Sequence, residues 1–252
     1  MKTKHLRILS YNIHKGFSSG NRRFVLEKMR EAIRKVHADI VFLQEVQGEH
    51  LVHQERVKEW PEASQFEFLA EKIWPHFAYG KNAVYSSGHH GNAILSKYPI
   101  IFSENIDVST SKLERRGLLH AKIELPDHEH HVHAICVHLG LRETDRGNQV
   151  RRICERIESH VPHGHPVIVA GDFNDWRGRA TGPLRRVLNA SEAFETIKGS
   201  HARTFPCWLP ALKLDRVYFR GLEAKDAETL SGKPWSDLSD HAALYVELTL
   251  PL

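Results

Sequence analysis

The stretch that decides the fold is HPVIVAGDFNDW, residues 165–176. Its apolar run at 167–170 is typical of a buried strand, and the glycine that follows introduces a turn. Asp172 and Asn174 come shortly after, so the strand delivers a carboxylate and an amide to its end. If the extended conformation continued, these two side chains would point to the same side. A strand-ending turn explains the same residues, because Gly, Asn and Asp are common in turns.

Hydrophobic residues make up 41% of the 252 residues and charged residues 26%, which suits one large globular domain or two small ones and excludes a disordered or fibrous protein. No internal repeat, low-complexity segment or linker divides the sequence, so we expect one domain spanning residues 1–252. No apolar run approaches the roughly 18 residues of a membrane span, and the N-terminal sequence lacks a signal-peptide pattern. We therefore expect a soluble monomer without an integral membrane segment.

The cysteines indicate the cellular compartment, but the net charge does not identify the substrate. Cys136, Cys154 and Cys207 are odd in number and widely spaced, which favours neither a disulfide framework nor a thiolate zinc site. We therefore expect a cytoplasmic protein. The formal charge of +4 is compatible with an anionic substrate, yet it falls short of the basic stripe of a dedicated nucleic-acid binder.

Three other predicted strands also end in polar residues. Their apolar runs, 6–13, 39–46 and 131–139, bring Asn12, Glu45 and His138 to the carboxyl ends. The remaining elements predicted up to residue 188 are strands at 77–85, 91–96 and 118–124 and helices at 22–36, 66–74, 142–160 and 180–188. Successive strands joined by turns form a meander, so we expect a mixed or antiparallel sheet.

The last two predicted strands add carboxylates and an imidazole. Asp215 interrupts the apolar run 211–219, and a buried carboxylate there needs a partner such as an imidazole. Asp240 and His241 precede the closing strand at 242–250. Because an antiparallel strand starts where its neighbours end, this pair can join the other strand ends on one rim.

A histidine-rich segment raises a separate zinc hypothesis. Its members are His128, His130, His131 and His133. Alternate histidines on one strand face can chelate zinc, but a histidine-rich hairpin tip is more often solvated, and no nearby Cys or paired carboxylate completes a tetrahedral set. Strand alternation also places Cys136 and His138 on one face and Ile135 and Val137 on the other. Both faces are largely apolar, which predicts a central strand.

Taken in chain order, these segments resemble the endonuclease/exonuclease/phosphatase superfamily, which includes deoxyribonuclease I. The resemblance covers nearly the whole chain. It rests on YNIH at 11–14, DIVFLQEV at 39–46, GNAILS at 91–96, VHLG at 137–140, GDFND at 171–175, LDRVYF at 214–219 and SDH at 239–241. It implies an α+β (mixed α/β) fold, a four-layer α-β-β-α sandwich of the deoxyribonuclease I-like type, with the active site at one end of two packed sheets.

The resemblance implies a metal site and a phosphate-binding site. Glu45 is expected to be the main ligand of magnesium (Mg²⁺, with Mn²⁺ as a substitute), helped by Asn12 and Asp240. Oxygen ligands suit this hard cation. The residues expected to bind substrate or phosphate are Asn12, Asn92, Arg116 and His138, with Arg115 as an alternative to Arg116.

The same resemblance implies the catalytic residues. His241, oriented by Asp215, would act as general base on the attacking water or contact the phosphate, and His138 would stabilise the phosphate oxygens. Asp172 and Asn174 would position the nucleophile and the scissile group. The sequence leaves open whether His241 or Asp172 takes the proton, and it assigns the neighbouring Asp175 to the turn.

The expected activity is hydrolysis of a phosphoester bond by in-line attack of an activated water. Negative charge that develops on the phosphate oxygens is stabilised by a metal, a histidine and an amide directed at that point. A phosphodiesterase, acting on nucleic acid or on a lipid headgroup, is the first expectation. The alternatives are a phosphomonoesterase on a small metabolite and a binding module without catalysis.

Departures from the family pattern bear on the substrate. His14 stands where abasic-site endonucleases of the family carry an acidic residue, and HARTFPCWLPALKLDR at 201–216 replaces their Trp-rich stretch, which argues against abasic-site repair. Loops 50–62, 86–90 and 177–183 are expected to flank the site. The side chains expected to shape it are His89, His90, Trp176 and Arg177.

Overall fold

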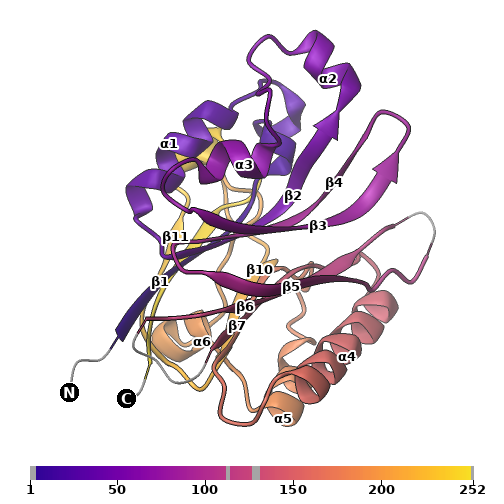
Figure 1. Cartoon of the computed structure of the whole chain (residues 1–252). Helices are drawn as coiled ribbons and strands as arrows, with labels where there is room; N and C mark the ends of the chain where they lie inside the picture. Colours follow the sequence, from indigo (N-terminus) through magenta and orange to yellow (C-terminus); the bar gives the residue numbers. More distant parts are fainter. Residues whose placement is uncertain (1–3, 112–113, 127–130, 251–252) are drawn as a thin grey trace.

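Two sheets packed face to face form the centre of the structure, a computed structural model that describes residues 4–111, 114–126 and 131–250 (Figure 1). The described residues form two six-stranded sheets. In order across the first sheet, the strands are β11 (Glu223–Leu230), β12 (Ala243–Leu250), β1 (Lys4–Asn12), β2 (Ile40–His50), β4 (Gly88–Ser96) and β3 (His76–Tyr85). Those of the second are β5 (Ile100–Asp107), β6 (Gly117–Ile123), β7 (Val132–His138), β8 (Val167–Asp172), β10 (Asp215–Arg220) and β9 (Ser191–Glu192).

Helices cover the outer face of each sheet, which gives the four layers. The helices are α1 (Leu26–Val36), α2 (Leu51–Arg56), α3 (Gln65–Ala70), α4 (Glu143–His160), α5 (Thr181–Leu188) and α6 (Ala193–Lys198), with short 3-10 turns at His14–Gly16, Ser19–Asn21 and Trp235–Asp237. Apolar residues of α1 and α3 pack on the first sheet, and those of α4 and α5 pack on the second. A third core fills the space between the sheets. The predicted α-β-β-α sandwich and mixed sheets are confirmed.

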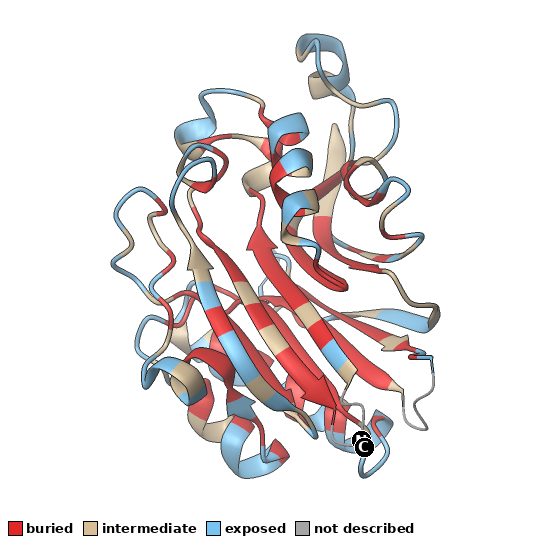
Figure 2. Ribbon diagram, turned by 90° about the vertical axis from the view of Figure 1, so that its left-hand side faces the viewer, coloured by how far each residue is buried: buried red, intermediate tan, exposed pale blue. Residues whose placement is uncertain are grey.

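Strand β7 follows the predicted alternation. Cys136 belongs to the core between the sheets, whereas Ile135 and Val137 pack against α4. Every residue of β7 is buried, as expected for a central strand. Figure 2 shows the same contrast in the first sheet, whose inner strands are buried along most of their length while its edge strand is largely exposed. Apolar burial therefore fixes the register of the central strands.

Several elements were missing from the sequence prediction. Strands β5, β9 and β11 and helices α2 and α6 were not predicted, and β10 begins at Asp215, whereas the predicted strand began at residue 211. β5 and β11 are mostly exposed and lie at or next to sheet edges, so neither shows the alternation that marks a half-buried strand. Asp215 therefore starts its strand instead of interrupting it.

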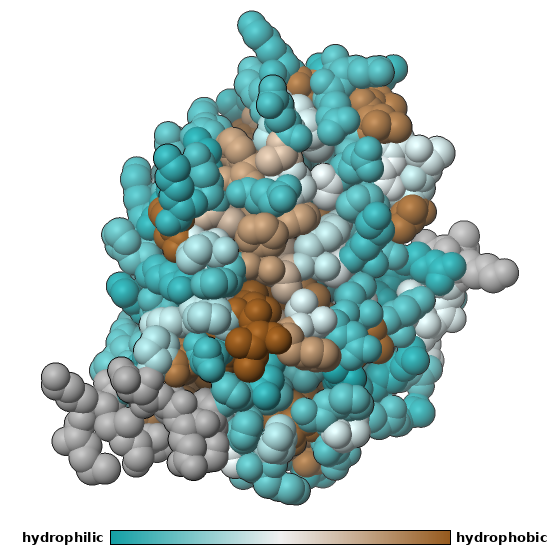
Figure 3. Space-filling model, viewed as in Figure 1, coloured by the Kyte–Doolittle hydropathy of each residue, from teal (hydrophilic) through white to brown (hydrophobic). Residues whose placement is uncertain are grey.

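The outer surface of the described residues is mostly polar, with some exposed apolar side chains (Figure 3). No helix in the described part of the chain is both long and apolar enough to cross a membrane. The face seen in Figure 3 is largely hydrophilic, with apolar surface gathered near its middle. Edge strands β3 and β5 leave Phe77, Ile101 and Phe102 partly exposed.

The described histidines of the zinc hypothesis lie away from any three-ligand cluster. Among described residues, the one group of three metal-ligating side chains whose atoms lie within 4.8 Å contains neither His131 nor His133. His128 and His130 lie outside the described residues. His133 instead pairs with His120, whose Nε2 lies 2.9 Å from His133 Nδ1. Arg156 Nε donates to His120 Nδ1 at 3.1 Å, so the proton of neutral His120 sits on Nε2 and points at His133.

We predict that this buried pair makes the protein less stable in mild acid. Burial lowers the pKa of His120 to about 3 and that of His133 to about 4, whereas unfolded histidines titrate near 6.5. Below pH 6.5 the unfolded chain therefore binds protons that the native pair does not. The free energy of unfolding should fall by up to about 2 kcal/mol per histidine between pH 7 and pH 5, measured by urea denaturation. His133→Gln should reduce this slope and exposed His163→Gln should not; equal slopes in all three proteins would contradict the prediction.

Candidate active site

Strand register brings the predicted polar residues of the second sheet into one row. His138 on β7 and Asp215 on β10 are both register partners of Asp172 on β8. Gly171 permits the close approach of β8 to β7, because a Cβ at this position, with φ +146°, would lie 1.9 Å from the carbonyl oxygen of Val137. The row therefore depends on a glycine directly before the central carboxylate.

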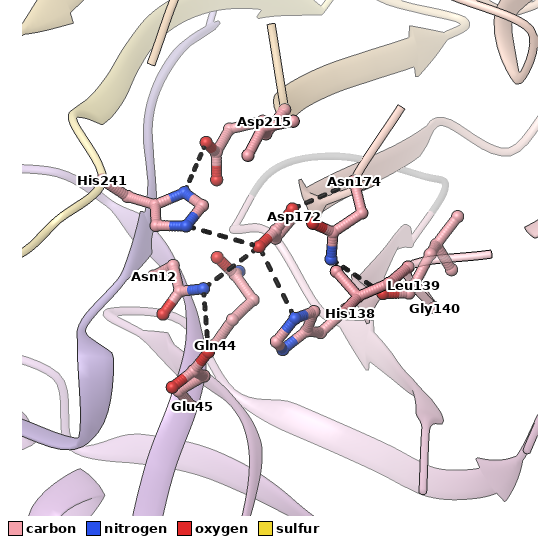
Figure 4. Close-up of polar contacts among 12 residues, drawn as sticks. Asn12, Gln44, Glu45, His138, Leu139, Gly140, Asp172, Asn174, Asp215 and His241 are labelled. Atoms are coloured by element: carbon pink, nitrogen blue, oxygen red, sulfur yellow. Dashed lines mark hydrogen bonds and ion pairs between the residues drawn. The ribbon is translucent and has the colours of Figure 1, made fainter. Parts of the chain in front are cut away.

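Asn12 joins this row to the first sheet. It ends β1, and its Nδ2 donates to Asp172 Oδ2 at 3.1 Å and to Glu45 Oε1 at 3.5 Å (Figure 4). Its Oδ1 accepts a hydrogen bond from the backbone N–H of His14 at 3.1 Å, which fixes the orientation of the amide. The side chain is almost fully buried. Asn12 is thus the polar link between the two sheets at this rim.

Asp172 lies at the centre of the cluster. Its Oδ2 is 3.5 Å from His138 Nε2 and 3.7 Å from His241 Nε2, in addition to the bond from Asn12. Burial raises the pKa of Asp172 to about 6, against the opposing effect of the positive charge on His241. The carboxylate therefore has the position and the proton affinity of a group that can exchange a proton near neutral pH.

His241 is the imidazole that pairs with buried Asp215, as the sequence predicted. His241 Nδ1 lies 2.9 Å from Asp215 Oδ2, and the ring packs against Phe205 with centroids 5.1 Å apart. Burial alone would lower the pKa of His241, but Asp215 and then Asp172 outweigh burial and raise it to about 10. The imidazole is therefore protonated at neutral pH.

Glu45 reaches the rim through an irregularity in β2 and not at a strand end. The strand continues to His50, its pairing with β4 shifts between Leu43 and Val46, and Glu45 has a positive φ of 55°. Such a bulge redirects a side chain. Burial raises the pKa of Glu45, but the positive charge around it, including that of Lys15, outweighs burial and lowers the pKa to about 2. Glu45 is therefore a carboxylate.

Asn174 is oriented by a turn instead of by continued strand geometry. Asp172 Oδ1 accepts from the backbone N–H of Asn174 at 2.9 Å, and Asn174 has a φ of 51°, so the extended conformation does not continue. Asn174 Nδ2 donates to the carbonyl of Leu139 at 2.9 Å. Asp175 Oδ2 accepts from the backbone N–H of Ala180 at 2.7 Å, in line with its assignment to the turn.

The remaining predicted residues lie around the rim with different contacts. Asp240 Oδ1 is 3.7 Å from His14 Nδ1, and Arg116, directly before β6, pairs with Glu114 at 2.8 Å. Asn92 is buried between the sheets, where its Nδ2 donates to the carbonyls of Gly117 and Cys136. These bonds give no support to a phosphate contact for Asn92, which stays a prediction.

The structure adds one residue that sequence reasoning missed, Lys15, and places Gln44 in a contact between the sheets. Lys15 lies in the turn after β1, with its Nζ 3.6 Å from Glu45 Oε2. Gln44 lies beneath Glu45 and donates from Nε2 to Cys136 Sγ at 3.3 Å. Burial lowers the pKa of His138 well below its usual value, and the nearby charge of Arg116 acts in the same direction, so His138 is neutral. No sequence pattern marked Lys15, because its position depends on the loop conformation.

The comparisons with known proteins agree with this architecture. The model described as "Endonuclease/Exonuclease/phosphatase family" matches residues 9–241. This chain belongs to the endonuclease/exonuclease/phosphatase family. It is 49% identical over 244 residues to the uncharacterized protein YbhP of Escherichia coli K12, covering 97% of this chain and 96% of YbhP. The family members are phosphoester hydrolases.

Solved structures show the same fold at low sequence identity. A family protein from Bacteroides thetaiotaomicron superposes with a TM-score of 0.77 at 17% identity, and all of both chains is covered. The mannosyl-6-phosphatase Bt3783 of the same species has a TM-score of 0.73 at 16% identity, covering 96% of this chain and 99% of Bt3783. At these identities the likeness shows the fold alone.

Enzymes of this family typically use a divalent metal, and the rim carries two possible sets of ligands. Asp172, Asp215 and His241 offer atoms within 4.8 Å of one another. In that group, however, the facing atoms of Asp215 and His241 are already bonded to each other. Asn12, Glu45 and Asp240 offer oxygen donors, and Glu45 is ionised and partly accessible. By donor type alone, the second set suits a hard cation, because all three residues offer oxygen, whereas the first set includes an imidazole nitrogen.

We predict that Asp175 supports the fold and not the reaction. Asp175→Ala removes a buried acceptor and should lower the free energy of unfolding by about 1–3 kcal/mol. Asp175→Asn keeps a carbonyl oxygen for the N–H of Ala180 and should retain most of the stability. Urea denaturation of both variants provides the measurement. Equal losses in the two variants would show that the negative charge, and not the hydrogen bond, is what matters.

Proposed function

We propose that this protein is a magnesium-dependent phosphoester hydrolase and that its preferred substrates are phosphodiesters. The observation that carries the proposal is the placement of Asp172, which lies 3.1 Å from Asn12, 3.5 Å from His138 and 3.7 Å from His241. A carboxylate, an amide and two imidazoles then converge on one point, with Glu45 joined through Asn12. We also propose that residues 1–252 act as one domain, because both sheets contribute to this cluster.

Glu45, Asn12 and Asp240 would hold the magnesium ion. When bound, the ion supplies a Lewis acid that stabilises negative charge on phosphate oxygens. Ionised Glu45 supplies the strongest oxygen donor of the three, and the bond from the His14 backbone to Asn12 Oδ1 holds that amide in place. Lys15 would compete with the cation for Glu45, so its flexible side chain would move aside on binding.

Asp172 is the group that we assign as general base. His241 is flanked by the carboxylates of Asp215 and Asp172, and an imidazole held in its protonated form has no lone pair for a proton from water. Asp172 would take the proton, and the water oxygen would bond to phosphorus while the bond from phosphorus to the alcohol breaks. The released alkoxide takes a proton from solvent.

Other rim residues would orient the reactants. Asn174 uses its Nδ2 for Leu139, which leaves its carbonyl oxygen to accept a hydrogen bond from the attacking water. Protonated His241 would donate from Nε2 to a phosphate oxygen, and neutral His138 can donate one further hydrogen bond. Arg116 would add positive charge beside His138. A monoesterase acting on a small metabolite is the alternative, and hydrolysis of 4-nitrophenyl phosphate in preference to bis(4-nitrophenyl) phosphate would favour it.

We predict that activity requires both the metal ligand Glu45 and the catalytic residues Asp172 and His241. The wild-type protein should hydrolyse bis(4-nitrophenyl) phosphate with Mg²⁺ and lose this activity in EDTA. Glu45→Ala, Asp172→Asn and His241→Ala should each lower kcat/KM by about 100-fold or more, because each removes charge stabilisation or proton transfer. Exposed His163→Gln is the control. Wild-type rates for either Glu45→Ala or His241→Ala, or no turnover of any phosphoester, would overturn the proposal.

A further inference from the structure

A pocket of about 420 Å³ opens beside the metal set. Four segments line it: the turns after β1, the end of β2, helix α2 and the hairpin between β3 and β4. They lie at the end of the molecule where Figure 1 labels α2. The lining residues that matter here are Lys15, Phe17, Gln47, His53, Tyr85 and His90. We call it the histidine pocket, and its volume is that of a site for a small molecule.

A series of side-chain contacts links the histidine pocket to the catalytic rim. Asp172 is bonded to Asn12, Asn12 to Glu45, and Glu45 lies 3.6 Å from Lys15 Nζ, which lines the pocket. In-line displacement places the leaving alcohol opposite the attacking water. If the water lies at Asp172, as proposed, the alcohol would leave on the side away from Asp172, and the Lys15 end of this series is where the pocket lies.

The walls of the pocket are polar but carry little charge. Burial lowers the pKa of His90 to about 4, and it also lowers the pKa of His53, so both rings are neutral at pH 7. Gln47 Nε2 donates to the hydroxyl of Tyr85 at 3.2 Å, and Gln47 Oε1 lies 3.4 Å from His53 Nδ1. Lys15 is thus the one lysine or arginine among the lining residues.

Aromatic rings form the remaining part of the wall. The His53 ring lies 5.2 Å from the ring of Phe17 and 5.1 Å from that of Trp60, and it stacks on His50 at 3.6 Å. These contacts fix the position of His53 before any ligand binds. The wall thus combines fixed rings with amide and hydroxyl groups. Such a wall suits a compact molecule that has both C–H faces and several hydroxyls. A nucleic-acid strand would instead require several cations along its backbone.

We infer that the histidine pocket binds the leaving alcohol of the substrate and that this alcohol is a compact polyhydroxylated group, a sugar or a polyol. This inference rests on the proposed function, because it takes phosphoester cleavage at the rim as given. It adds that specificity is set by His53, Gln47 and Tyr85, none of which touches the catalytic cluster through a hydrogen bond in the described structure. The esters of such alcohols should therefore be preferred over DNA.

The test compares substrates with and without hydroxyls in wild type and in two pocket variants, His53→Ala and Tyr85→Phe. The hydroxylated esters are glucose 6-phosphate, a monoester, and glycerophosphoglycerol, a diester, and each is compared with a reference ester of its own class, 4-nitrophenyl phosphate or bis(4-nitrophenyl) phosphate. His53→Ala should raise KM for a hydroxylated ester about tenfold, as expected for one lost hydrogen bond, and Tyr85→Phe should act in the same direction. For either reference ester, kcat/KM should change by less than about twofold. Exposed Gln54→Ala on the same helix is the matched control.

Two results would overturn the assignment of the pocket. One is an equal loss of activity on hydroxylated and reference esters in the pocket variants. The other is faster cleavage of a short single-stranded DNA than of either hydroxylated ester by wild type. If wild type cleaves no ester at all, the proposed function fails, and the pocket is then judged by calorimetric binding of glucose 6-phosphate in EDTA. About tenfold weaker binding by His53→Ala than by wild type would support the pocket, and no binding by wild type would overturn it.

Discussion

The hydrogen bond from Asn12 to Asp172 is the interaction on which the site depends. It connects the end of β1 in one sheet to the end of β8 in the other, and both side chains are almost completely buried. Apolar residues of both sheets pack between them, and this packing holds the sheets together without directing any particular polar group toward another. A buried bond between polar groups specifies one arrangement, since leaving either group unpaired costs about 1–3 kcal/mol.

Much of the site could be predicted because its residues sit where buried strands end. Apolar runs are visible in a sequence, and so are the polar residues near their ends, such as Asn12, His138 and Asp172, although a turn alone would also explain Asp172. The partnership of Asp215 with an imidazole could also be predicted, because a buried carboxylate needs a partner. The expectation that Asp172 and Asn174 point to the same side assumed a continuing strand. It was wrong, because the Asn174 N–H bonds to the Asp172 side chain and the backbone turns there.

Features that depend on irregular backbone could not be predicted. Glu45 was expected at a strand end, but it lies in a bulge of a strand that continues to His50, and alternation cannot reveal such a bulge. Lys15 and the histidine pocket depend on loop conformations fixed by contacts distant in sequence, such as the bond from Gln65 to the Lys15 carbonyl. Exposed strands like β11 lack an apolar face, so their pairing with a neighbour decides their structure.

The balance of charge explains why these groups tolerate burial together. Three carboxylates lie close to one another at the rim, those of Asp172, Asp215 and Glu45, and each would be costly to bury alone. His241 offsets two of them by lying between Asp215 and Asp172, and Lys15 offsets Glu45. Lys15 is partly exposed, so on the proposed mechanism a divalent cation would take its place beside Glu45 without disturbing Asp215 and His241. That mechanism therefore assigns proton transfer to the buried groups around Asp172 and metal binding to the more accessible groups around Glu45.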